Sequence, residues 1–266
     1  MTIAEYMLHA DQVVAAAKAD QFEGLVAEFL DRGGFARLLP EFEFPLVLGL
    51  RTPEPFEFFG NDLDIPANGW RFRTEFRLRQ DRLAHHYFNV FRLPDLQDLD
   101  LARSMLCCAD DPLYTRINAL VSQEFQYLRT RVKFTQATPA PAAGKQYYRV
   151  ERQFQLRNLG AYLFGIGACF PALEQVGWKN LGIHQAVTGE LNTLVEFWEL
   201  PAESPQQDVL EVLQQHFAAL YEMMVKPYPA QASAGDVFVD ASYATGARLS
   251  TPAPPIEQPI PLSAAS

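Results

Sequence analysis

The stretch Tyr147–Leu200 decides the fold, and it reads YYRVERQFQLRNLGAYLFGIGACFPALEQVGWKNLGIHQAVTGELNTLVEFWEL. Its start is rich in aromatic and β-branched residues that alternate roughly, as in a strand. Apolar residues then recur at helical spacing up to Val176, and Gly177 suits the position just past a helix end. Two further apolar runs, 181–188 and 191–200, predict a strand pair joined by a turn at Gly189-Glu190.

Residues 204–240 are predicted to add a helix and a last strand to this unit. Ser204-Pro205-Gln206-Gln207 is a capping sequence, and an apolar stripe from Leu210 to Met224 predicts a second helix. Asp236–Asp240 supplies a last strand. The order strand, helix, strand, strand, helix, strand is the split βαβ unit, so the second half is predicted to be a ferredoxin-like αβ-sandwich.

The first half shows a weaker version of the same order. Its predicted elements are a largely helical segment 10–39, strands at 44–50, 70–79 and 83–91, a helical segment 99–127 that is either continuous or broken at Asp110-Asp111-Pro112, and a closing strand 131–135. The agreement with the second half predicts a diverged internal repeat. The predicted fold class is therefore α+β, with two ferredoxin-like halves forming an internal pseudo-dimeric α/β barrel.

Proline-rich segments set the expected domain boundaries. Ala137–Gly144 is a Pro/Ala linker, and it separates an N-terminal half, 1–136, from a C-terminal half, 145–248. Residues 249–266 form a Pro-rich tail.

Composition excludes several classes of protein. The net charge of −10 argues against nucleic acid and against a polybasic membrane patch. No apolar run reaches the roughly 20 residues of a membrane span, and no signal peptide is evident, so a cytoplasmic location is expected. The three cysteines form no CxxC pair, which favours buried thiols and no metal site. No phosphate-binding loop or GxSxG element is present.

The second half resembles the NIPSNAP family of the dimeric α/β-barrel superfamily. The resemblance is carried by three segments: 151–157 with Gly160, 182–192 with its Gly-x-Leu-Asn turn, and 195–198 with its closing Trp. It implies a barrel that the family usually builds from two chains. If the first half is a copy, the barrel forms within one chain. If it is not, a homodimer is needed to cover the open sheet face.

The predicted catalytic residues lie on the strand pair 181–200. Alternation along each strand predicts that His184 and Glu196 share the interior face with Trp198. His184 is the candidate base, and Glu196 its partner or the acid, since burial raises a carboxyl pKa and histidine titrates near neutrality. The alternative is that buried His, Glu and Arg only satisfy one another.

Other residues are predicted to bind a small-molecule substrate. Arg149 or Arg152 would hold an anion, while Tyr148 and Trp198 would shape the site. His85 and His86 are neighbours on a strand and face opposite ways, so only one enters the interior, and His86 is counted as substrate-binding. The arginines of strand 70–79 are either an anion clamp or a solvated face: Arg71, Arg73, Arg77 and Arg79.

Three functions remain open from the sequence. The first is an enzyme that acts on a small organic molecule without a cofactor, by isomerisation, cyclisation, elimination or O₂-dependent oxidation. The second is a haem enzyme or carrier with His85, His86 or His184 as axial ligand, which superfamily relatives imply. The third is a non-catalytic interaction protein that docks through its acidic surface and Pro-rich tail.

Overall fold

The structure is a computed structural model of the 266-residue chain. It describes residues 5–34, 38, 46–57, 83–93, 111–132, 144–187, 191–202 and 207–241, with backbone alone for 232–237. The predicted strand 70–79 with its arginines, the linker residues 137–143, the turn 188–190, Cys107, Cys108 and the tail lie outside these ranges.

The first half of the chain contributes a strand-helix-strand-strand-helix-strand unit. Its elements are β1 (Tyr6–Ala15), a 3-10 turn (Ala16–Lys18), α1 (Ala19–Asp31), β2 (Leu46–Arg51), β3 (Phe56–Glu57), β4 (Leu83–Leu93), α4 (Pro112–Asn118) and β5 (Val121–Arg131).

The second half repeats this order. Its elements are β6 (Gln146–Gln153), α5 (Leu156–Gln175), β7 (Lys179–Ala186), β8 (Thr193–Glu199), α6 (Val209–His216), α7 (Ala218–Met224) and β9 (Ala232–Ala241).

The strand order confirms the internal pseudo-dimer. Within the halves the orders are β2-β4-β1-β5 and β7-β8-β6-β9, so the strands of each half stand in the sequence second, third, first, fourth. The halves join where β5 pairs with β7 and where β2 pairs with β9. Both junctions are antiparallel, and together they close the sheet into a barrel, with the short β3 added beside β4.

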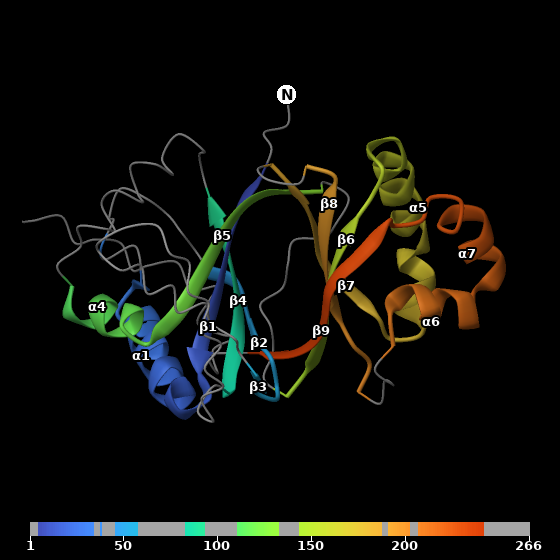
Figure 1. Cartoon of the computed structure of the whole chain (residues 1–266). Coiled ribbons are helices and arrows are strands. Elements are labelled where there is room, and N and C mark those ends of the chain that lie inside the picture. Colours follow the sequence, from blue (N-terminus) through green and yellow to red (C-terminus); the bar gives the residue numbers. More distant parts are fainter. Residues whose placement is uncertain are drawn as a thin grey trace, which may run out of the picture.

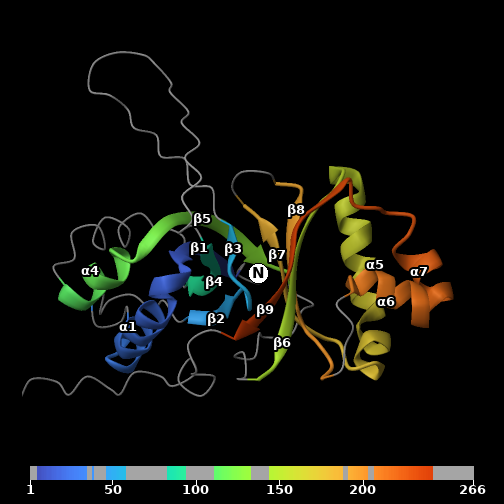
Figure 2. The same cartoon turned by 60° about the horizontal axis from the view of Figure 1, so that its bottom comes forward.

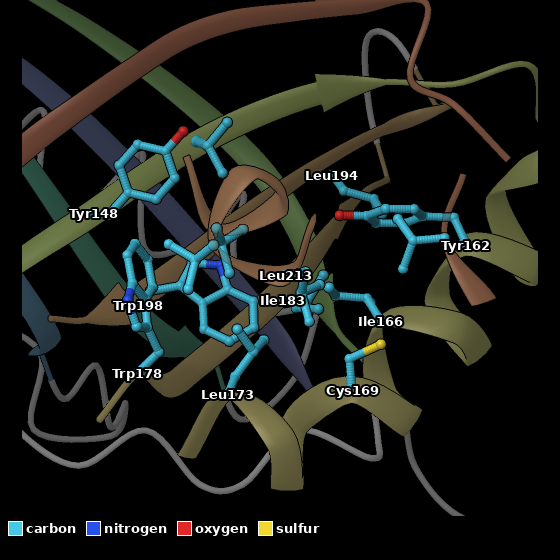
Figure 3. Packing of buried hydrophobic residues seen from close by; sticks show 14 of the residues in the cluster. Tyr148, Tyr162, Ile166, Cys169, Leu173, Trp178, Ile183, Leu194, Trp198 and Leu213 are labelled. Atoms are coloured by element: carbon cyan, nitrogen blue, oxygen red, sulfur yellow. The ribbon is translucent and has the colours of Figure 1, made fainter. Parts of the chain in front are cut away.

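The helices lie outside the barrel. Figure 1 shows α1 and α4 against the strands of the first half, α5 and α6 against those of the second, and α7 on the outer side of α5 and α6; Figure 2 shows the same layers after rotation. Buried apolar residues form a core under each helical layer and a third core between the two sheets. The core of the second half packs Trp178 and Trp198 against α5 (Figure 3) and includes the buried Cys169. This confirms the prediction that Cys169 is a buried thiol.

Two first-half predictions are wrong. Residues 10–15 belong to strand β1 and are not helical, and of the predicted helix 99–127 the described part is helical only at Pro112–Asn118. Helix-favouring alanines surround residues 10–19, but pairing with β4 and β5 overrides this weak preference. Asp111 is the N-cap of α4, and its side chain accepts hydrogen bonds from Leu113 N and Tyr114 N.

Asn192, the last residue of the Gly-x-Leu-Asn sequence, has a structural role. The Asn192 side-chain amide donates to the Phe154 carbonyl, and the Asn192 carbonyl accepts from Phe154 N. The turn before β8 is thereby tied to the end of β6, which positions the strands that carry the candidate site.

Candidate functional site inside the barrel

Strand register places His184 and Glu196 on opposite faces of the sheet. His184 lies opposite Val195 across the β7–β8 ladder, and Glu196 lies opposite Ile183. Because paired residues share a face, the prediction that His184 and Glu196 share the interior is wrong. Alternation fixes faces within one strand but not between strands, and β7 has a register irregularity between Asn180 and Gly182.

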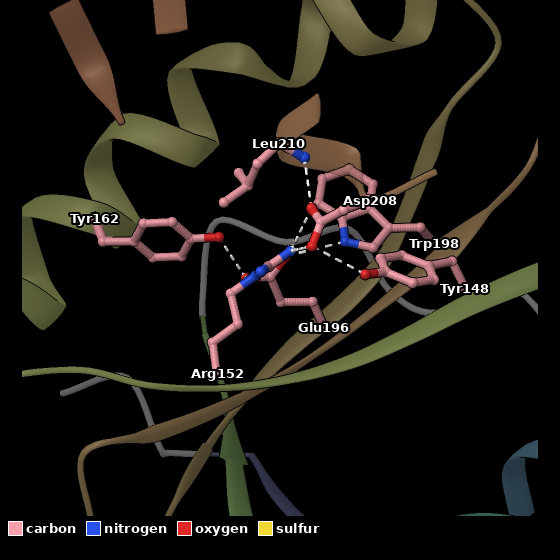
Figure 4. A network of polar contacts seen from close by, with 7 residues as sticks. All are labelled: Tyr148, Arg152, Tyr162, Glu196, Trp198, Asp208 and Leu210. Atoms are coloured by element: carbon pink, nitrogen blue, oxygen red, sulfur yellow. Dashed lines mark hydrogen bonds and ion pairs between the residues drawn. The ribbon is translucent and has the colours of Figure 1, made fainter. Parts of the chain in front are cut away.

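Glu196 lies under the helices in a network of hydrogen bonds and ion pairs (Figure 4). Its carboxylate accepts from the Tyr162 hydroxyl at 2.5 Å and from Trp198 Nε1 at 3.0 Å, and it lies 3.4 Å from Arg152 Nε. Burial raises the pKa of Glu196, while the charge of Arg152 and the two hydrogen bonds oppose that rise. Among the described residues, this carboxylate contacts Tyr162, Trp198 and Arg152, which hold it in place.

The same network attaches α6 to the sheet. Arg152 Nη2 donates to both Asp208 oxygens at 2.7 and 2.8 Å, and the Tyr148 hydroxyl donates to Asp208 at 3.0 Å. Asp208 also accepts from Leu210 N at 2.7 Å and caps α6. The predicted substrate contacts Arg152, Tyr148 and Trp198 thus accompany Glu196 on the helix side, away from His184. Their proposed placement in the barrel interior is wrong.

The barrel interior instead holds a pair of buried histidines. His9 Nε2 of β1 lies 2.9 Å from His184 Nδ1 of β7, in hydrogen-bond contact. Both rings pack on Phe197, with centroids 5.8 and 5.5 Å away. Both are almost completely buried, and His184 Nε2 has no hydrogen-bond partner among the described residues.

These histidines are neutral at ordinary pH. Burial, followed by the charges of His184, Arg129 and Arg149, holds the pKa of His9 well below 6.5. Burial and the charges of Arg129 and Arg131 lower the pKa of His184 to about 3. A neutral imidazole carries one lone pair and can accept a proton, but burial and the nearby arginines make that protonation unfavourable. The expectation that His184 titrates near neutrality is not met by the described site.

A charged cluster crosses the interior beside the histidines. Glu151 of β6 accepts from Arg129 Nη2 at 3.0 Å and from Arg149 Nη2 at 3.2 Å. Asp11 of β1 lies 3.5 Å from Arg149 Nη2. We call Asp11, Arg129, Arg149 and Glu151 the interior charge cluster. It joins the two halves, since Asp11 and Arg129 come from the first and Arg149 and Glu151 from the second.

Part of this cluster lacks protein partners. Asp11 Oδ1, Arg129 Nε and Arg129 Nη1 are buried and accept or donate no hydrogen bond among the described residues. Burial raises the pKa of Asp11 to about 6, against the lowering effect of Arg149 and Arg129. The cluster approaches the surface at Glu151, whose side chain is 27% exposed. Phe125 and Tyr127 on β5 are also exposed, at 40% and 38%.

The prediction that His85 and His86 face opposite ways, with only one of them in the interior, is confirmed. His86 lies opposite Val13 on the interior face, and its ring stacks on Phe88 at 4.1 Å. His85 faces the other way, and its Nδ1 contacts the Thr52 carbonyl at 2.9 Å. Burial and Arg149 lower the pKa of His86 to about 4. Of the two predicted anion-binding arginines, Arg149 is the one in the interior, beneath Phe88 at 4.6 Å.

Sequence reasoning missed His9, Asp11 and Arg129. The first two were assigned to a helix or its approach, and Arg129 fell between a predicted helix and a predicted strand. The available signal was the alternation of Met7, His9, Asp11 and Val13, which is the pattern of a strand with a partly polar face. The repeat itself also required a strand before the first helix.

The described residues give little basis for a metal ion. Among them no group of three or more His, Cys, Asp or Glu is placed to bind one. For haem, His184 Nε2 is a buried imidazole nitrogen without a partner, which is the atom type an axial ligand requires. Within the described ranges, no helix has the length and apolar character to span a membrane.

The strand order and the closure of the sheet define an α/β barrel built from two ferredoxin-like halves within one chain. No protein-family model matches the sequence, and no curated protein matches it either. The narrower NIPSNAP resemblance stays a prediction.

Several solved structures are similar at very low identity. A putative monooxygenase from Lactobacillus acidophilus is 8% identical, with 90% of this chain and 97% of that chain covered and a TM-score of 0.49. An anthrone oxidase-like protein is 9% identical, with coverage of 91% and 94% and a TM-score of 0.48. A putative chlorite dismutase is 8% identical, with coverage of 93% and 98% and a TM-score of 0.47. Likenesses this distant do not bear on the reaction.

Proposed function

We propose that this protein is an enzyme that transfers a proton to or from a small organic molecule inside the barrel, with His184 as the base. The observation that carries the proposal is the buried His9–His184 contact of 2.9 Å at Nδ1, together with a His184 Nε2 that has no hydrogen-bond partner among the described residues. A buried polar atom in a folded protein normally has a hydrogen-bond partner, and a catalytic role is one explanation of an exception.

The geometry favours His184 as the proton acceptor and His9 as the residue that orients it. If His184 Nδ1 donates to His9 Nε2, the lone pair of His184 Nε2 is left free to accept a proton. His9 then fixes the tautomer and stabilises the imidazolium that forms, as an orienting group does in other acid–base sites. Isomerisation, cyclisation, elimination and O₂-dependent oxidation of an acidic substrate all begin with such a step. No cofactor is needed for it.

Hydrogen–deuterium exchange tests this proposal without knowledge of the final product. The protein would be incubated in D₂O with a panel of enolisable carbonyl compounds, and loss of the C–H signal followed by proton NMR. Wild type is expected to accelerate exchange for at least one compound, and His184→Gln to abolish that acceleration with a melting temperature within a few degrees of wild type.

His216→Gln is the matched control, because His216 is exposed at the end of α6 and far from the interior in the fold. It is expected to exchange like wild type. No exchange by wild type across the panel, or full exchange by His184→Gln, contradicts the proposal.

A haem-binding function is the second candidate, and His184 Nε2 favours it by the same lack of a partner. Haem would supply redox chemistry, while His184 would be the ligand and His9 would orient its ring. Titration of the protein with haem and measurement of a Soret band separates the two candidates. A Soret band that His184→Gln abolishes and His216→Gln retains supports haem.

A further inference from the structure

We infer that the barrel interior binds a small, largely apolar carboxylate, and that Arg129 is the residue that holds its anionic group. The inference deepens the proposed function and rests on it, since it names the substrate class of the same interior. It is carried by the geometry of the interior charge cluster.

Arg129 is a buried cation with unused donors. Its side chain is 3% exposed. Its Nη2 donates to Glu151 at 3.0 Å, whereas Nε and Nη1 have no hydrogen-bond partner among the described residues. Burying such donors unpaired is costly, and a carboxylate is the acceptor whose shape and charge suit a guanidinium. Arg129 therefore retains binding capacity after its structural contact is made.

The surroundings of Arg129 favour an apolar body on that carboxylate. Its guanidinium carbon lies 5.4 Å from the centre of the Tyr127 ring. The core between the sheets is packed from aliphatic and aromatic side chains of both halves, among them Met7, Phe88, Val90, Leu181, Val195 and Phe197. An aromatic carboxylate matches this combination of one cation and many apolar contacts.

Charge balance gives Asp11 a part in binding. Arg129 and Arg149 are already faced by Glu151 and Asp11, so an added anion brings excess negative charge. Glu151 is partly exposed, whereas Asp11 is buried, its Oδ1 has no hydrogen-bond partner among the described residues, and burial raises its pKa to about 6. An adjacent anion raises that pKa further, so Asp11 takes up a proton and can donate it to the ligand.

The other titratable groups that face the interior charge cluster are not expected to take up a proton in the same pH range as Asp11. His9, His86 and His184 all have pKa values lowered by burial, the last two to about 4 and about 3, so they are neutral between pH 6 and 8 without ligand. Burial raises the pKa of Tyr127 as well. The affinity for a carboxylate is therefore expected to rise as pH falls from about 8 to about 6, with Asp11 as the group that binds the proton.

The same anion would make the histidine pair a stronger base. The positive charge of Arg129 is among the causes that lower the pKa of both His9 and His184. A carboxylate on Arg129 offsets that charge and raises the pKa of both rings. Binding of the correct ligand class thus prepares the base that the proposed reaction uses.

Calorimetric titration with benzoate, and with benzamide as its uncharged counterpart, tests the inference on the full chain. Wild type is expected to bind benzoate about tenfold or more tightly than benzamide. Arg129→Gln is expected to lose that preference. Arg51→Gln is the control, because Arg51 pairs with Glu23 and so belongs to the outer face beside α1. It should keep the preference.

Proton uptake is measured by repeating the titration at pH 6 and pH 8 in two buffers of different ionisation enthalpy. Wild type is expected to take up a proton with benzoate, and Asp11→Asn to show none and a flat pH dependence. Equal binding of benzoate and benzamide by wild type, or an unchanged preference in Arg129→Gln, overturns the inference. Because binding needs no turnover, benzoate binding without deuterium exchange contradicts only the proposed function, and the reverse result contradicts only this inference.

Discussion

The buried carboxylates Glu196 and Asp11 show how neighbours decide the role of a residue. Glu196 meets a tyrosine hydroxyl, an indole N–H and a guanidinium, so its hydrogen-bonding capacity is used within the framework. Asp11 has one long contact to Arg149 and an oxygen with no partner among the described residues. Equal burial therefore makes one carboxylate structural and leaves the other available to a ligand.

Replacement of Glu196 tests that distinction. Glu196→Gln keeps the shape of the side chain but removes the charge that faces Arg152 and one acceptor oxygen. We expect the free energy of unfolding to fall by about 3 kcal/mol, the usual cost of breaking a buried ion pair from one side. Urea denaturation measures the loss, and deuterium exchange per folded molecule should be unchanged.

Glu174→Gln is the control for Glu196→Gln, since Glu174 is exposed on α5. Its effect on unfolding should stay within about 0.5 kcal/mol, as for most surface substitutions. If Glu196→Gln lost deuterium-exchange activity while its free energy of unfolding stayed unchanged, Glu196 would have a catalytic role and not only a structural one.

The buried histidines predict an acid-sensitive fold. The pKa of His184 is about 3 in the folded protein against 6.5 ordinarily, so below pH 6.5 the unfolded chain binds a proton that the barrel excludes. Stability must then fall as pH drops from about 6.5 towards 3, by on the order of 5 kcal/mol from this residue over the full window. Denaturation midpoints measured between pH 7 and pH 4 should fall less steeply in His184→Gln than in wild type.

Asp11 has the opposite effect on the pH dependence of stability, and it contributes to the same denaturation profile. Its pKa is raised from 3.8 to about 6, so the folded state binds a proton first and gains stability as pH falls through that window. Asp11→Asn should therefore steepen the acid loss, while His216→Gln should follow wild type. A free energy of unfolding that is flat between pH 7 and pH 4 in wild type and in His216→Gln would contradict the burial of a neutral pair.

At the level of elements, the contact between α5 and α7 depends on one glycine. A Cβ added to Gly165 would overlap the Met224 carbonyl group, which is backbone and cannot rotate away. Gly165→Ala should therefore lower the free energy of unfolding by about 1–3 kcal/mol, as overpacking does. Gly160→Ala on the same helix meets nothing within 4 Å and should raise it by about 0.5–1 kcal/mol, because alanine is the better helix former.

Thermal or urea denaturation of the two alanine variants checks this pair directly. Opposite signs are the expected outcome. A neutral or stabilising Gly165→Ala would mean that α5 and α7 are not in the close contact described.

The elements of the second half were predictable because each pattern there agrees with its neighbours. Strand β6, helix α5 and the β7–β8 pair all fall within a few residues of their predicted bounds. In the first half, β1 has residues with helical preference but pairs on both edges. Pairing with distant strands is not visible in local sequence, so the strand was missed.

The site was less predictable than the fold for a related reason. Alternation placed His184 and Val195 correctly within their own strands, but the offset between β7 and β8 is set by tertiary pairing. The partner of His184, His9, lies 175 positions away in the chain. No local pattern joins residues that barrel closure brings together.

At the level of the whole molecule, fusion of the halves permits an asymmetric interior. In a barrel made of two identical chains, every interior residue appears twice, related by the two-fold axis. Here β1 contributes His9 and Asp11, whereas its counterpart β6 contributes Arg149 and Glu151. Opposite charges therefore meet across the interior, which identical chains would achieve only by repeating each pair.

The same closure predicts that the halves remain together when the chain is cut. A protease site inserted between Ala140 and Pro141 would give two fragments that correspond to the halves. Both contribute to the core between the sheets, and the contacts His9–His184, Arg129–Glu151 and Arg149–Asp11 all cross from one half to the other. The cleaved fragments should therefore co-elute in gel filtration and keep the melting transition in one cooperative step. A protein cleaved only within the tail after Ser250 controls for the protease. Separation of the halves in the absence of denaturant would show that the interior is too weakly held to close a barrel.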